Sequence, residues 1–393
     1  MTTLVNDLPA DWREGVFLGR LALPEGPTPV LVRDGRVIDI SGWAPTSAQA
    51  GAREDLATAT GRDLGDLDAL GLSAAYQAPD RSPRLLSPLD LQCVKASGVT
   101  FAVSAVERVI EERARGDADK AQAIRAALAD RVGADLSAVR PGSDQAFALK
   151  DALIADGLWS QYLEVAIGKD AEIFTKAPVL SSVGWGDWVG VRPDSVWNNP
   201  EPEVVVVVDP TGRVIGATLG NDVNLRDIEG RSALLLGKAK DNNASAALGP
   251  FIRLFDGGFT LDDVRDAKVA LRVEGEDGFV LEGASSMRLI SRDPLDLVGQ
   301  TLNENHQYPD GFALYLGTMF APIQDRDAPG QGFTHKTGDL VTVSSERLGT
   351  LRNRVTTSDK APPWRFGLVD LMYNLAGRGL LEERPHERRL SIA

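Results

Sequence analysis

The sequence has almost none of the residues that form disulfide bonds and soft-metal sites. Its 393 residues include one cysteine, Cys93, so no disulfide bond can form within the chain. A lone cysteine fits a reducing compartment, and we expect a cytoplasmic protein. There are three histidines, His306, His335 and His386, and none is close in sequence to the acidic segment described below. A zinc site is therefore not expected there.

Long apolar runs and excess positive charge are also missing. The densest apolar run, Val204–Val208, is far too short to cross a bilayer, and Met1–Gly15 lacks the pattern of a secretory signal. The formal net charge is −14, and an acidic surface repels the phosphate backbone of nucleic acids. We expect a soluble globular protein with neither membrane nor nucleic-acid partners.

The N-terminal part reads as a small β-rich domain over residues 1–84. Val16–Leu23 and Val30–Ile40 alternate apolar and polar residues, as strands do, and Asp34-Gly35 within the second run predicts a hairpin turn. Residues 42–82 are rich in Ala, Gly, Asp and Pro and predict a linker with short helical pieces.

A larger domain is expected over residues 85–393. Its early part predicts a helical insertion at about residues 105–163, with helices over Ala105–Arg115, Lys120–Val132 and Gln145–Ala155. After Glu172 the chain becomes rich in short apolar runs that predict strands: Val179–Val183, Val204–Val208, Leu271–Val273 and Val341–Val343. The fold class that fits this order is α+β, with a core of mixed, curled β-sheet.

An acidic pair precedes the most apolar predicted strand. Glu201 and Glu203 point to the same face because side chains alternate along a strand, and the valines that follow predict burial on both faces. Two adjacent carboxylates repel each other, and burying them is costly unless a cation compensates them. The pair therefore suggests a divalent cation, although charges exposed to solvent at the end of a hairpin would give the same pattern.

A third carboxylate is predicted to join the pair. If the strands are centred on the turn Asp209–Gly212, residues 220–222 lie beside 199–201, and Asp222 reaches the two glutamates. An all-oxygen site favours Mg²⁺ or Ca²⁺ over zinc, with Mn²⁺ as a substitute. Lys238, which follows in Lys238–Asn243, is a candidate for binding or polarising a substrate, although most lysines are surface residues.

These motifs resemble the fumarylacetoacetate hydrolase superfamily over roughly Leu85 to Val355. The resemblance is carried by Glu201-Pro202-Glu203, Gly220–Asp227, Lys238-x-x-Asp241, Gly317-Thr318, Gly338–Val341 and Leu348–Asn353. It implies a mixed β-sandwich roll around one divalent metal, preferably Mg²⁺, held by Glu201, Glu203 and Asp222. It also implies a homodimer or homotetramer.

The chain departs from the superfamily where its hydrolases carry a histidine and, three residues later, a glutamate. In Gly98–Glu107 the histidine position is Ser104, and Glu107 remains. A serine cannot act as a base at neutral pH without an activating partner, so hydrolysis of a C–C bond is not expected. Ser104 and Glu107 also match the Ser-x-x-Glu box that caps helix N-termini, and Ser104 has either role or both.

Within the superfamily the chain is similar to sugar-acid dehydratases of the 2-keto-3-deoxy-D-xylonate type. The similarity implies a hydro-lyase of pentose catabolism that converts a 2-keto-3-deoxypentonate to 2-oxoglutarate semialdehyde. Glu107 would be the base that removes a C3 proton, directly or through water, aided by Ser104 and Lys238. The substrate would be bound by Thr318, Lys176, Asn242 and Arg226. Lys176 would alternatively be a lysine that protects a strand edge from pairing.

Two other functions remain open from the sequence. One is a metal-dependent hydrolase or decarboxylase of acylpyruvate-like diketo acids, which needs a replacement for the missing histidine. The other is a metal-stabilised protein that binds keto acids without turnover.

Overall fold

Two β-sheets form the core of the computed structural model, which describes residues 2–381 except 116, 118–119, 122–123, 125–138, 156, 158, 321 and 329–331. The larger, 11-stranded sheet runs in the order β4 (Arg62–Asp66), β3 (Arg36–Asp39), β2 (Gly26–Arg33), β1 (Phe17–Leu23), β13 (Ala246–Leu254), β11 (Val214–Asp222), β10 (Pro202–Val208), β16 (Phe312–Tyr315), β6 (Cys93–Gly98) and β7 (Glu172–Ala177), with β5 (Arg84–Leu85) paired to β1. The second, 5-stranded sheet runs β15 (Val280–Ser286), β14 (Lys268–Glu274), β17 (Leu340–Ser345), β18 (Gly349–Thr357) and β8 (Trp188–Val191). A two-stranded ladder joins β9 (Asn198–Asn199) to β12 (Asn224–Leu225).

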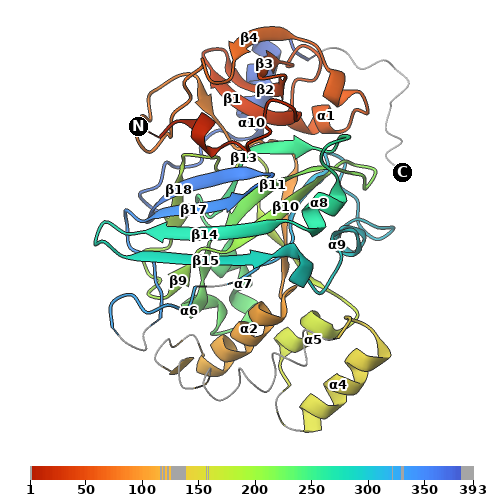
Figure 1. The fold of residues 1–393 in the computed structure, drawn as a ribbon, viewed down its shortest axis with the longest axis vertical. Helices are drawn as coiled ribbons and strands as arrows, with labels where there is room; N and C mark the ends of the chain where they lie inside the picture. Colours follow the sequence, from red (N-terminus) through yellow and green to blue (C-terminus); the bar gives the residue numbers. More distant parts are fainter. Residues whose placement is uncertain are drawn as a thin grey trace.

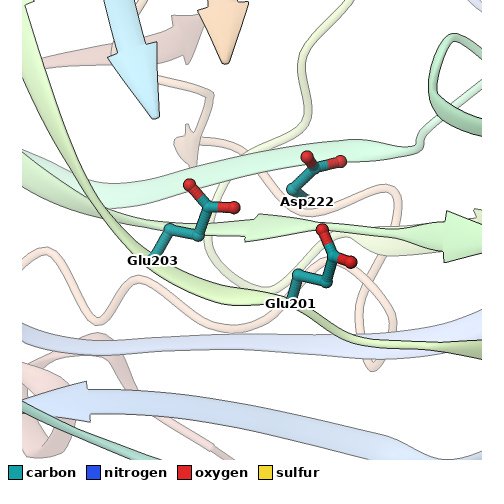
Figure 2. A group of neighbouring side chains, drawn as sticks. All are labelled: Glu201, Glu203 and Asp222. Carbon is teal, nitrogen blue, oxygen red and sulfur yellow. The ribbon is translucent and has the colours of Figure 1, made fainter. Parts of the chain in front are cut away.

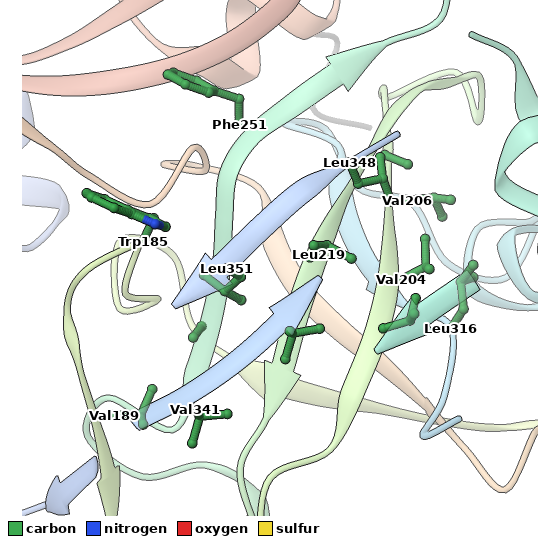
Figure 3. Packing of buried hydrophobic residues seen from close by; sticks show 14 of the residues in the cluster. Trp185, Val189, Val204, Val206, Leu219, Phe251, Leu316, Val341, Leu348 and Leu351 are labelled. Carbon is green, nitrogen blue, oxygen red and sulfur yellow. The ribbon is translucent and has the colours of Figure 1, made fainter. Parts of the chain in front are cut away.

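The two sheets pack face to face around one apolar core (Figure 3). Val204, Val206 and Leu219 of the larger sheet belong to the same buried cluster as Val341 and Leu351 of the smaller one. Burial of these side chains between two sheets is the arrangement of a β-sandwich. With the helices described next, it confirms the α+β class.

The helices of the described residues are α1 (Ser47–Gly51), α2 (Ala102–Ala114), α4 (Asp144–Ala155), α5 (Gln161–Ile167), α6 (Arg226–Glu229), α7 (Leu236–Lys240), α8 (Leu261–Arg265), α9 (Pro294–Thr301) and α10 (Leu368–Gly377). Helices α2, α4, α5, α6 and α7 lie at one end of the sandwich, and α1 and α10 lie at the opposite end (Figure 1). Helices α2, α4 and α5 share an apolar cluster of their own beside α6 and α7. The predicted insertion is thus present, although its expected helix Lys120–Val132 lies largely outside the described residues.

Strand β10 is buried on both faces, as its run of valines predicts. Val204 and Val206 face the smaller sheet, while Val205 and Val207 belong to a second apolar cluster on the opposite face. Every residue of β10 is buried. The acidic pair therefore lies at the start of a strand that is buried along its whole length.

The N-terminal strands continue the larger sheet. The hairpin at Asp34-Gly35 forms as predicted, with both residues at positive φ, and β4 is a strand that the linker prediction missed. Strand β1 pairs with β13 at Phe17↔Arg253 and Leu18↔Ile252. Residues 1–84 are thus hydrogen-bonded to the rest of the sheet, and the division of the chain at residue 84 remains an expectation.

The predicted strand Val179–Val183 is wrong. These residues form a turn, and the segment's contact with the sheet is a single bridge, Val183↔Ala247. Leu180 has a φ of 64°, which a strand cannot contain. No helix among the described residues is long and apolar enough to span a membrane.

The double-sided burial of β10 gives a test of the core. Val206→Ala removes two buried methyl groups, and we expect it to lower the free energy of unfolding by about 2 kcal/mol. Val196→Ala is the matched control, since Val196 is 79% exposed, and its effect should stay within about 0.5 kcal/mol. Urea unfolding at one protein concentration measures both, and equal effects would contradict the packing of β10.

Candidate metal centre and active site

Three carboxylates converge where β10 begins and β11 ends (Figure 2). Glu201 and Glu203 lie on one face of the chain entering β10, and Asp222 is the last residue of β11. One oxygen from each lies within 4.8 Å of the others, and each residue is 1% exposed. The alternative of solvent-exposed hairpin charges is therefore wrong.

The strands bring Asp222 to the pair in a register that differs from the predicted one. Pro202 pairs with Asn221 and Glu203 with Gly220. Val208 pairs with Val214, one residue away from the predicted register, and an irregularity at Val207/Val208 adds a second residue. The shift totals two residues and so keeps the same side chains on the same face. The Asp222 N–H donates to the Glu201 carbonyl at 3.0 Å, which fixes the two strand ends together.

Three cations surround the acidic triad. The Lys240 Nζ lies 2.5 Å from Glu201 Oε2 and 3.1 Å from Asp222 Oδ2. The Lys176 Nζ is 2.7 Å from Asp222 Oδ1, and the Arg108 Nη2 is 2.5 Å from Glu201 Oε1. Burial alone would raise the pKa of Glu201, but Lys240 and Arg108 lower that pKa to about 2.

Glu203 is the carboxylate that these cations leave uncompensated. Among the described residues it has no ion-pair partner, and its oxygens accept from the Gly317 N–H at 2.7 Å and the Thr318 hydroxyl at 3.2 Å. Burial, Asp222 and Glu201 raise the pKa of Glu203 well above its usual range. A group of buried oxygen ligands with one uncompensated member fits a hard divalent cation. The triad residues and Thr318 thus lie together, as the sequence predicted.

The lysine that reaches the triad from α7 is Lys240, which corrects the expectation for Lys238. The Lys238 side chain is 43% exposed and its ammonium is 3.8 Å from Asp194. Residues two apart in a helix point about 200° away from each other, so only one of these lysines can face the site. Asn242 also lies elsewhere: its amide donates to the Lys238 carbonyl, and it lines a separate cavity with Trp364.

Lys176 points into the site. It lies on β7 at the edge of the larger sheet, yet the side chain is fully buried and donates to the Val223 carbonyl at 3.1 Å. The alternative of a lysine that protects the strand edge is therefore wrong. Burial lowers the pKa of Lys176, and the neighbouring Asp222 opposes this change.

Ser104 both caps a helix and lies at the site, the two roles that the sequence left open. Its hydroxyl donates to the Phe101 carbonyl at 2.8 Å and accepts from the Phe101 N–H at 3.3 Å, at the start of α2. It also lines the cavity at the triad. Helix α2 begins after Phe101, however, so the predicted capping box that pairs Ser104 with Glu107 is wrong.

A network of buried charges lies behind the triad. The Arg108 Nη1 is 2.6 Å from both Glu111 Oε2 and Glu229 Oε2, and the Arg226 Nε is 3.1 Å from Glu111 Oε1. Burial lowers the pKa of Arg226, and the carboxylates of Glu111 and Glu107 oppose this change. Glu107 and Arg226 are buried in this network. Among the described residues, Arg108 and Glu229 line the triad cavity, and Glu107 and Arg226 do not.

Four residues that line the triad cavity were not predicted from the sequence: Lys240, Arg108, Glu229 and Glu172. Glu172 could have been predicted from the sequence, because Glu172, Phe174 and Lys176 are two residues apart along β7 and so share one face of the strand. Its carboxyl lies against Gly98, where an added Cβ would be 1.8 Å from Glu172 Oε2. Burial raises the pKa of Glu172.

The carboxylates of the triad should differ in how they affect stability. Glu201→Gln leaves Lys240 and Arg108 without their shared partner, and we expect a loss of about 3 kcal/mol. Glu203 has a raised pKa, so its stabilising contribution is greatest below the unfolded pKa and is lost as the pH rises through the folded value. Glu203→Gln should therefore reduce the fall in stability with rising pH.

Thermal unfolding of both variants in EDTA, from pH 5 to 8, measures these effects, and calorimetry with Mg²⁺ should show loss of binding in each. Unchanged Mg²⁺ affinity in either variant would contradict the triad as a metal site.

The comparisons with known proteins agree with this geometry. The family described as fumarylacetoacetate (FAA) hydrolase C-terminal matches residues 174–356. A probable 2-keto-3-deoxyxylonate dehydratase of Haloferax volcanii is 29% identical over 271 residues, which cover 62% of this chain and 89% of the relative. A 2-dehydro-3-deoxy-D-arabinonate dehydratase of Saccharolobus solfataricus is 31% identical over 183 residues, covering 46% and 57%.

The fold is also similar to solved structures. The apo form of a 2-keto-3-deoxy-D-arabinonate dehydratase superposes with a TM-score of 0.61 at 21% identity, covering 86% of this chain and 98% of that one. A complex of this kind of dehydratase with magnesium and 2,5-dioxopentanoate gives a TM-score of 0.60 at 21% identity, with the same coverage. The resemblance predicted from the motifs is confirmed by the match of the fumarylacetoacetate hydrolase C-terminal family to residues 174–356, and the chain has the fold of these solved dehydratases.

Proposed function

We propose that the protein is a divalent-metal-dependent hydro-lyase that dehydrates a 2-keto-3-deoxypentonate, preferentially the D-xylonate derivative, to 2-oxoglutarate semialdehyde. The observation that carries the proposal is the buried triad of Glu201, Glu203 and Asp222 with Lys240 and Lys176 in contact. Two relatives are named for dehydration of such acids, and the 2,5-dioxopentanoate bound in the similar structure is the product expected here.

The triad would hold Mg²⁺, or Mn²⁺ as a substitute, through its three carboxylates. A bound divalent cation stabilises the negative charge that develops on a 2-keto acid when a C3 proton leaves. The substrate loses this proton and the C4 hydroxyl as one water molecule. A proton then moves from C5 to C3, and the resulting enol becomes the C5 aldehyde.

The buried cations are placed to bind and orient the acid. Lys240 is held between Glu201 and Asp222, which together raise its pKa against the effect of burial, so it stays an ammonium and attracts a carboxylate. Lys176 is fixed by Asp222 and the Val223 carbonyl. Thr318 and Ser104 supply hydroxyls at the cavity wall.

Two carboxyl groups are proposed for the proton transfers. Glu172 lines the cavity, and its raised pKa suits an acid that protonates the departing C4 hydroxyl. Glu107 lies on α2 one turn before Glu111, and we propose that it removes the C3 proton through a water molecule. Arg226 holds this part of α2 in place through Glu111.

A hydrolase of acylpyruvate-like acids is less well supported. That reaction needs a base in place of the missing histidine, and no histidine is among the described residues that line the cavity. The Nδ1 of His335 is 3.1 Å from Asp339 Oδ2, and the imidazole is buried against Phe333.

The proposed function is tested with metal-stripped protein and 2-keto-3-deoxy-D-xylonate, with and without added Mg²⁺. The aldehyde product is followed by coupling to an NAD(P)-dependent dehydrogenase. Mg²⁺-dependent product supports the proposal. No turnover of any 2-keto-3-deoxypentonate stereoisomer would overturn it, and cleavage of an acylpyruvate under the same conditions would establish the hydrolase instead.

The two lysines of α7 offer a matched pair for the site assignment. Lys240→Ala should reduce kcat/KM by at least about a hundredfold, because the ammonium that holds Glu201, Asp222 and the substrate is lost. Lys238→Ala removes an exposed ammonium from the same short helix and should leave turnover within about twofold of the unchanged protein. Similar losses in both variants would contradict the placement of Lys240 alone in the site.

The roles of Glu107 and Glu172 are separated by exchange of the C3 protons in D₂O, followed by NMR. Glu172→Gln should keep this exchange while dehydration falls by about a hundredfold. Glu107→Gln should lose both exchange and dehydration, with Mg²⁺ affinity unchanged. Normal dehydration in either variant would remove that residue from the mechanism.

A further inference from the structure

A second cavity, of about 340 Å³, lies away from the acidic triad. It is enclosed by β1 and β2, the turn at Leu180–Val183, and the segment that includes Pro362 and Phe366. The described residues that line it are all different from those that line the triad cavity. Its volume falls within the range of about 300–1,000 Å³ that is typical of small-molecule sites.

Two opposite charges face this cavity without bonding to each other. The Arg84 guanidinium has no hydrogen-bond or ion-pair partner among the described residues, although its charge acts on Asp187. Asp187 accepts from the Gly184 N–H at 2.8 Å through Oδ2, and no described cation lies within 4.0 Å of its carboxylate. Burial raises the pKa of Asp187 to about 6, with Gly184 and Arg84 opposing this rise.

The other charged residue of the cavity is already compensated. Arg20 donates to the Ser87 carbonyl at 3.2 Å and to the Leu89 carbonyl at 2.5 Å, and its Nε is 3.5 Å from Asp90 Oδ2. Arg20 therefore belongs to the wall of the cavity. Arg84 and Asp187 remain as the charged groups with free capacity for a ligand.

The rest of the wall is mainly apolar. Leu23, Leu86, Trp188 and Phe366 contribute side chains that would cover an aliphatic or aromatic group. An apolar wall with a few convergent polar groups is the usual composition of a site for a small organic molecule.

The backbone around the cavity is strained in two places. Leu180 has a φ of 64° and Ala244 a φ of 60°, and both line the cavity. Positive φ is unfavourable for residues with a side chain, and such conformations concentrate at binding sites. This observation is independent of the charges and points to the same place.

We propose that this cavity binds a small zwitterion, an α-amino acid with an apolar side chain. The Arg84 guanidinium matches the geometry of a carboxylate, and the Asp187 carboxylate accepts from an ammonium. The apolar side chain of the ligand packs against Trp188 and its neighbours. A simple carboxylate would leave Asp187 unpaired and close to a second negative charge, and a simple amine would leave Arg84 unpaired.

Isothermal titration of the full chain with L-phenylalanine and L-leucine tests the proposal. The single-charge analogues 3-phenylpropanoate and 2-phenylethylamine are titrated in parallel. We expect saturable binding of the amino acids and at least about tenfold weaker binding of each analogue, since each analogue leaves either Arg84 or Asp187 without a partner in the cavity. Absence of saturable binding up to the solubility of both amino acids would overturn the proposal.

Two variants test whether the ligand binds in this cavity. Arg84→Gln should weaken binding of L-phenylalanine by about tenfold or more and leave 2-phenylethylamine unaffected, and Asp187→Asn should weaken L-phenylalanine and leave 3-phenylpropanoate unaffected. Arg81→Gln, at an exposed arginine three residues earlier, is the control and should change neither.

Melting temperature and Mg²⁺ affinity report whether each variant is folded, and Arg84→Met, which also removes the charge, replaces Arg84→Gln if the latter does not fold. Binding that is insensitive to both Arg84 and Asp187, or equal for the amino acids and their single-charge analogues, would reject the assignment. The inference is independent of the proposed dehydration and survives if that activity is absent.

Discussion

The Lys240 ammonium lies between Glu201 and Asp222, at 2.5 Å and 3.1 Å from their carboxylate oxygens, and this contact permits the burial of the acidic triad. A carboxylate removed from water is strongly destabilising unless a cation or several donors accompany it. Arg108 supplies the second cation to Glu201, and Lys176 the second to Asp222. The positions of α2, α7 and β7 are therefore tied to the charge balance of two strand ends.

The sandwich provides the rigid support that this charge balance needs. Strand β10 packs against an apolar cluster on each face, so its backbone cannot shift without opening both. The neighbouring β11 is bound to it along the ladder, and the Asp222 N–H holds the Glu201 carbonyl. Side chains attached to such a framework keep their separation, which a site for a small divalent ion requires.

The sequence was sufficient for the parts of the site that depend on local periodicity. Alternation along a strand placed Glu201 and Glu203 on one face, and the hairpin brought Asp222 to them despite a shift of two residues. The sequence does not distinguish Lys238 from Lys240, because a helix of about one turn has too few residues to show which face is buried. Arg108 could not be identified from local pattern, because its contact with Glu201 spans 93 positions of the chain.

Contacts between residues far apart in the sequence also limited what could be predicted about the mechanism and the domains. Glu229 reaches the site through Arg108 and has no local pattern that marks it. Strand β1 joins β13 through two residue pairs, and the composition of the N-terminal segment could not predict this pairing.

The Arg108 guanidinium occupies one oxygen of the Glu201 carboxylate. A divalent ion at the triad would compete with this guanidinium for the Glu201 carboxylate, so its affinity would be a difference between two favourable arrangements.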